Sequence, residues 1–164
     1  MHRPPAKPSL CTQPAQARLD KAQRTAKSLR ELLAASRFGA EFSEVRTLER
    51  DADAVLEHVE RRCGVLDTLC AVTGPTPAII EAQQSVAAEL DAHIADLREA
   101  LDAAAVFVSV GTTEAVAELR ERTAHVHAIA AAAAELQASA AAASMPVGVP
   151  RALRLAAPKT GSER

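Results

Sequence analysis

Between residues 77 and 109, small or apolar residues recur at alternating intervals of three and four, and this repeat constrains the fold more than any other feature. A seven-residue repeat of this kind places its side chains along one stripe of an α-helix. The pattern therefore predicts one long helix that packs along this stripe. Gln83 is the one polar member of the repeat, which consists of Ile80, Gln83, Ala87, Leu90, Ile94, Leu97, Leu101, Ala104 and Val108.

Glycine and proline residues divide the rest of the chain. Similar spacing predicts further helices, so that the expected helices cover residues 15–36, 41–72, 77–109 and 113–143 of one helical domain. Thr76 is expected to cap the third helix, with Pro77 in its first turn. In the fourth helix the expected apolar face continues to Leu136 and Ala140. The sequence predicts an all-α fold of long antiparallel helices, and it leaves open whether they form a bundle or an extended coiled-coil hairpin.

Charge is distributed unevenly along the chain. Residues 1–30 have a net charge of +6 and the last twenty residues +3, so the segment between them carries −11 within a total of −2. Prolines 4, 5, 8 and 14 predict a disordered basic arm over residues 1–14, and residues 144–164 are expected to be a flexible basic tail. An acidic centre argues against a nucleic-acid-binding core.

The sequence offers no membrane-spanning or secretory segment. A span needs about 20 apolar residues, and Glu135 interrupts the alanine-rich run that starts at Ala128. We therefore expect a cytoplasmic protein. The basic, acid-poor start leaves a mitochondrial presequence as the alternative, with cleavage near Arg37.

Motifs for chemistry are missing. Metal-binding carboxylate bundles use Glu-x-x-His pairs, which are absent, and neither a phosphate-binding loop nor a Gly-x-Ser-x-Gly turn is present. We therefore expect no enzyme activity, no cofactor and no bound metal. His93 and His125 are expected at the edges of apolar faces.

The cysteines support a second hypothesis. Cys63 and Cys70 share a helix face about 10 Å apart along the axis, too far for a disulfide between them, and are expected to be buried thiols. The alternative function is a metal- or redox-responsive bundle that uses His93, His125 and Cys63 or Cys70, with Cys11 on the basic arm as a redox partner.

Part of the chain resembles a known subunit. Residues 79–84 (Ile-Ile-Glu-Ala-Gln-Gln), the leucine spacing up to Leu101-Asp102, a short link, and Leu119 followed by His125 and His127 are similar to the small helical shoulder subunit of dynactin. The resemblance covers residues 79–143. The chain departs from it at Gly111-Thr112, where the family tends to have proline, and in its excess of alanine. The resemblance implies a non-catalytic subunit that packs against long helical partners in a cytoskeletal motor adaptor.

These observations favour a non-catalytic assembly or adaptor subunit that acts through helix packing. Its expected partners are other helical proteins or further copies of itself, with no nucleic acid and no membrane-spanning segment. The residues expected to form the packing interface are Val59, Leu66, Ile80, Leu90, Ile94, Leu97, Leu101, Leu119 and Val126.

Overall fold

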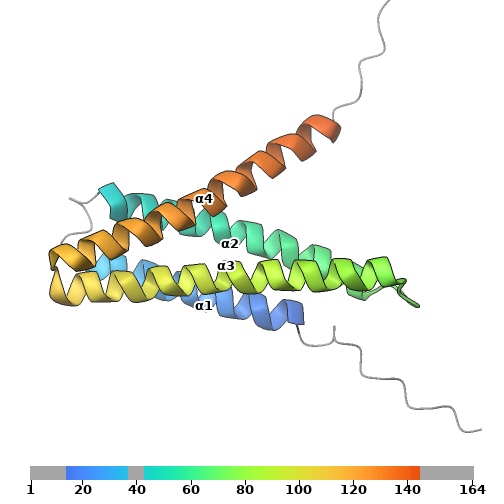
Figure 1. Ribbon diagram of the computed structural model, residues 1–164, viewed down its shortest axis with the longest axis horizontal. Helices are drawn as coiled ribbons and strands as arrows, with labels where there is room; N and C mark the ends of the chain where they lie inside the picture. Colours follow the sequence, from blue (N-terminus) through green and yellow to red (C-terminus); the bar gives the residue numbers. More distant parts are fainter. Residues whose placement is uncertain (1–13, 37–42, 145–164) are drawn as a thin grey trace, which may run out of the picture.

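A computed structural model describes residues 14–36 and 43–144 as four α-helices (Figure 1). Every helix end lies within two residues of its predicted position, and the described ranges contain no strand. The prediction of an all-α fold is confirmed. Cys11 and most of the predicted arm and tail lie outside the described residues. The helices are α1 (Pro14–Ala35), α2 (Ser43–Cys70), α3 (Pro77–Val110) and α4 (Thr113–Ser144).

The helices form a bundle in which α2 and α3 are the central pair. α1 and α4 each pack against both members of this pair but not against each other. They flank it on opposite sides, with α1 and α3 running in one direction and α2 and α4 in the other (Figure 1). The structure thereby selects the bundle over the extended hairpin.

Local signals in the sequence set the boundaries around α3. The hydroxyl of Thr76 accepts a hydrogen bond from the Ile79 amide at 3.4 Å, with Pro77 at the first helical position. Gly111 ends the helix with φ of 62° and ψ of 24°, a left-handed conformation that glycine adopts without strain. Thr112 accepts from the Ala115 amide at 3.3 Å and so caps α4. These contacts satisfy helix-end amides that have no partner within their helix.

The core consists of leucine, valine, isoleucine and alanine side chains from all four helices. α3 packs against three helices, so its buried face is wider than the predicted stripe and also includes Val86, Ala100, Ala103 and Phe107. Of the residues expected to form a packing interface, Leu101 is half-buried and Ile80 is 41% exposed. Those buried within the chain's own bundle are Val59, Leu66, Leu90, Ile94, Leu97, Leu119 and Val126.

One end of the bundle is open. There the second half of α4 diverges from the other helices (Figure 1). All residues from 134 to 144 are exposed, and none from 77 to 85, the start of α3, is buried. Leu136 and Ala140, which the sequence placed on the apolar face of α4, are thus not buried within this chain. We call residues 77–85 and 134–144 the open end.

Gln83, the polar member of the α3 repeat, links the central pair. Its side-chain amide donates a hydrogen bond to the Leu69 carbonyl at 2.9 Å. Leu69 lies in the last turn of α2, where carbonyls have no partner within the helix. A glutamine in the repeat thus caps the neighbouring helix.

Candidate functional site

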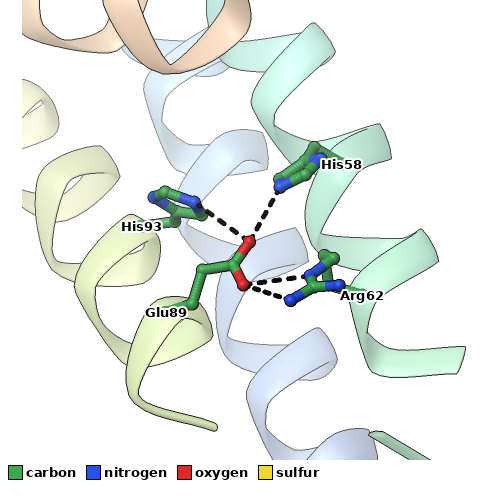
Figure 2. A network of polar contacts seen from close by, with 4 residues as sticks. All are labelled: His58, Arg62, Glu89 and His93. Carbon is green, nitrogen blue, oxygen red and sulfur yellow. Dashed lines mark hydrogen bonds and ion pairs between the residues drawn. The ribbon is translucent and has the colours of Figure 1, made fainter. Parts of the chain in front are cut away.

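Four polar side chains from the central pair meet around the Glu89 carboxylate (Figure 2). His58 Nε2 lies 3.2 Å from Glu89 Oε1, and His93 Nε2 lies 3.8 Å from the same oxygen. Arg62 binds the other oxygen, Oε2, through Nε at 3.0 Å and also through Nη2. One carboxylate oxygen therefore faces two imidazoles, while a guanidinium holds the other.

Helix geometry explains how these residues come together. His58 and Arg62 are four residues apart on α2, and Glu89 and His93 are four residues apart on α3. Residues at this spacing share one face of a helix. Because α2 and α3 pack directly against each other, the two pairs meet at their interface. We call His58, Arg62, Glu89 and His93 the polar cluster.

The environment of the polar cluster favours an ionised carboxylate and a neutral imidazole. Burial alone would raise the pKa of Glu89, but hydrogen bonds from Arg62 and His58 outweigh it, and the pKa lies below its usual value. Burial, followed by the nearby His58, lowers the pKa of His93. Glu89 is therefore an anion near neutral pH, and His93 retains a free nitrogen lone pair.

His93 is incompletely satisfied. Its Nδ1 atom is buried and has no hydrogen-bond partner among the described residues. The ring packs edge-on against that of His58, with centroids 5.5 Å apart and an interplanar angle of 61°. His58 itself is only 6% exposed. Two imidazoles thus lie deep between the helices, and one has a nitrogen that makes no stabilising contact.

A groove of about 410 Å³ lies between the polar cluster and α4. His58, Glu89 and His93 form one side of it. The side contributed by α4 is mainly apolar and is lined by His125, Ala128, Ile129, Ala132, Ala133 and Leu136. The groove therefore combines nitrogen and oxygen donors with an apolar wall.

The structure brings together only some of the residues that the sequence singled out. His93 and His125 line the same groove, as the metal-responsive hypothesis requires. Cys63 does not join them: its thiol contacts the Ala15 carbonyl of α1 at 3.5 Å, and burial raises its pKa. A protonated, buried thiol is a poor nucleophile, so Cys63 gives little support to a redox role. Cys70 is half-buried near the end of α2.

Sequence reasoning missed three members of the polar cluster. His58, Arg62 and Glu89 were not among the candidates, because the pattern sought was Glu-x-x-His within one helix. The pairs present are His58 with Arg62 and Glu89 with His93, each spaced by four residues. The four-residue spacing within each of two predicted helices was the available signal, but it does not show that these two helix faces pack against each other.

Further polar contacts hold the first half of α4 against α2 and α3. Asp51 of α2 is 4% exposed, accepts a hydrogen bond from Arg50 Nε at 2.9 Å, and lies 2.7 Å from His127 Nδ1. Burial opposes ionisation of Asp51, but the bonds to Arg50 and His127 outweigh it and lower its pKa. Two exposed ion pairs, Arg120 to Glu44 and Arg122 to Glu99, add contacts at 2.7 Å.

Comparison with known proteins assigns no family. No family model, curated protein or solved structure matches the chain. The resemblance to the dynactin shoulder subunit stays a prediction. Within residues 14–36 and 43–144, no helix is both long enough and apolar enough to cross a membrane.

Proposed function

We propose that this protein is a non-catalytic assembly subunit that associates with a second copy of itself through the open end of its bundle. One observation carries the proposal. Residues 134–144 of α4 are helical yet exposed throughout, over about three turns. Alanine favours the helix without a partner, so this extension presents a formed and uncovered helix surface on which a partner can pack.

The surface of the open end suits a helix. The exposed part of α4 consists largely of alanine, with serine at two positions, and small side chains let two helix axes approach closely. Leu136 is 62% exposed on α4, and Ile80 is 41% exposed near the start of α3. These two large apolar side chains can anchor a packed helix at the same end of the bundle.

A second copy fits the charge and symmetry of this surface. Glu135 is the one ionisable residue in 134–144, so two such segments can pack with little like-charge repulsion. In a twofold dimer the same patch serves both subunits. Each copy carries both the α4 segment and the α3 start, so each can cover the other's exposed residues.

The alternative occupant is a long helix from a different protein, as the dynactin resemblance implies. We propose the cytoplasm as the setting for either assembly, with the mitochondrial alternative to be tested by looking for cleavage near Arg37. A wild-type chain that stays monomeric at its highest soluble concentration would reject self-association.

The test is light scattering after size-exclusion chromatography of the full chain over a range of concentrations. We expect a dimer for the wild type and a monomer for Leu136→Asp and Ile80→Asp. Val65→Asp is the matched control, because Val65 lies on α2 with the same 41% exposure as Ile80. A Val65→Asp variant that dissociates as readily as Ile80→Asp would contradict the assignment to the open end.

A further inference from the structure

We propose that His58, Glu89 and His93 form a binding site for a divalent transition-metal ion of the zinc type. All three residues belong to one chain, so the site needs no ligand from a second copy, although Leu136 of the open end lines the same groove. The proposal departs from the expectation, drawn from the sequence, that the protein binds no metal. Of the residues named in the metal-responsive hypothesis, it keeps His93 as a ligand.

The donor atoms are close to the spacing that zinc requires. Zinc binds nitrogen and carboxylate oxygen at about 2.0–2.2 Å, so tetrahedral ligands lie about 3.4 Å apart. His58 Nε2 and His93 Nε2 lie 3.2 Å and 3.8 Å from Glu89 Oε1, and the three donors are all within 4.8 Å of one another. Small side-chain rotations would bring the three donor atoms to bonding distance of one ion. In Figure 2 both imidazoles point toward the same oxygen of Glu89.

The chemistry of the donors matches their spacing. Imidazole nitrogen and carboxylate oxygen are both ligand types that zinc accepts, and the site supplies two imidazoles and one carboxylate. His58 becomes a ligand when its ring proton resides on Nδ1, which frees the Nε2 lone pair.

Arg62 is not a proposed ligand, but it orients the Glu89 carboxylate. Its guanidinium holds Oε2 and leaves Oε1 directed at the histidines (Figure 2). Hydrogen bonds that orient a ligating carboxylate in this way commonly strengthen metal sites. The guanidinium therefore occupies the carboxylate oxygen that does not face the two imidazoles.

A purely structural ion pair leaves one feature unexplained. Arg62 and His58 alone satisfy Glu89, yet His93 is placed beside them with a buried Nδ1 that lacks a partner among the described residues. Leaving such an atom unpaired costs free energy. A metal bond at Nε2 would add a favourable interaction to a histidine that, among the described residues, otherwise has only a 3.8 Å polar contact with Glu89.

The site also has room for a fourth ligand. The groove next to the donors is lined by His125 of α4. Zinc sites with three protein ligands commonly keep a fourth position for water or another group. His125 is outside the set of donors that lie within 4.8 Å of one another, so we assign it a contact with a water in that fourth position and not direct ligation.

The experiment uses full-length protein freed of metal by a chelator. Zinc titration by calorimetry should give one ion per chain, and cobalt should give the visible absorption of a tetrahedral nitrogen and oxygen site. His93→Gln and Glu89→Gln should weaken zinc binding at least 100-fold. His125→Gln should change the cobalt spectrum with a smaller loss of affinity.

Controls separate this site from adventitious binding and from the proposed assembly. His127→Gln removes a histidine that pairs with Asp51 outside the polar cluster and should leave zinc binding unchanged. Ile80→Asp, expected to be monomeric, should bind zinc as the wild type does. Circular dichroism checks that His93→Gln folds, which we expect because only a weak contact of His93 is lost. The proposal is overturned by a chain that binds no zinc at micromolar concentration, or by a folded His93→Gln variant with wild-type affinity.

Discussion

The two parts of α4 have opposite environments and different compositions: residues 113–133 contain four large apolar residues, Val116, Leu119, Val126 and Ile129, whereas residues 134–144 contain only Leu136 and are mainly alanine. The first half is buried along one stripe that includes Leu119 and Val126, whereas none of residues 134–144 is buried. Only the first half combines large buried side chains with the Asp51 to His127 contact. Alanine is sufficient for helix formation, but attachment to the bundle also requires larger apolar residues and polar contacts.

The largest expected effect is a charge introduced into the packed region. Ile94 is buried in α3, and an unpaired carboxylate there is costly, so Ile94→Asp should abolish the cooperative thermal transition seen by circular dichroism. Leu136→Asp, in the exposed half of α4, should melt like the wild type in dilute solution. An Ile94→Asp chain that remains helical and fully assembled would contradict the assigned core.

Truncating one leucine in each half of α4 compares them directly. Leu119→Ala should lower the free energy of unfolding by about 2–5 kcal/mol, because it leaves a cavity in the core. Leu136→Ala should change it by no more than about 0.5 kcal/mol in the monomer, as is usual for surface sites. Urea denaturation at low protein concentration measures both, and equal losses would show that the second half of α4 is packed.

The polar contacts that hold the first half of α4 against α2 can be tested at Asp51 by varying the pH. Its folded pKa is lowered, so ionised Asp51 stabilises the fold above its unfolded pKa of about 4, and this stabilisation is lost as the pH falls through the folded value. Asp51→Asn should cost roughly 1–2 kcal/mol at neutral pH and weaken the dependence of stability on pH below about 4. Melting temperatures of both chains between pH 7 and pH 2 give the comparison. Parallel pH profiles would exclude this role.

The smallest effect should come from glycine in the exposed half. Ala138→Gly and Ala141→Gly each reduce local helix stability by about 1 kcal/mol, without removing a buried contact of the monomer. Faster amide hydrogen exchange over residues 134–144, with an unchanged melting temperature, is the expected result. A lowered melting temperature in the monomer would mean that this segment supports the core.

Much of the fold could be predicted because its signals are local. The Thr76 cap, the left-handed Gly111 and the spacing from Leu90 to Leu97 depend on residues within a few turns of one another. The polar cluster could be predicted only in part. The sequence placed His93 at the edge of an apolar face, but bringing Glu89 beside His58 depends on contacts between α2 and α3.

The sequence by itself determined the number, length and limits of the helices, because helical period and end-capping are short-range properties. Only the tertiary structure decided which faces meet. Several packings satisfy the same period, and the choice depends on how large side chains fit together across helices. That choice placed α2 and α3 at the centre, joined His58 and Arg62 to Glu89 and His93, and left the end of α4 uncovered.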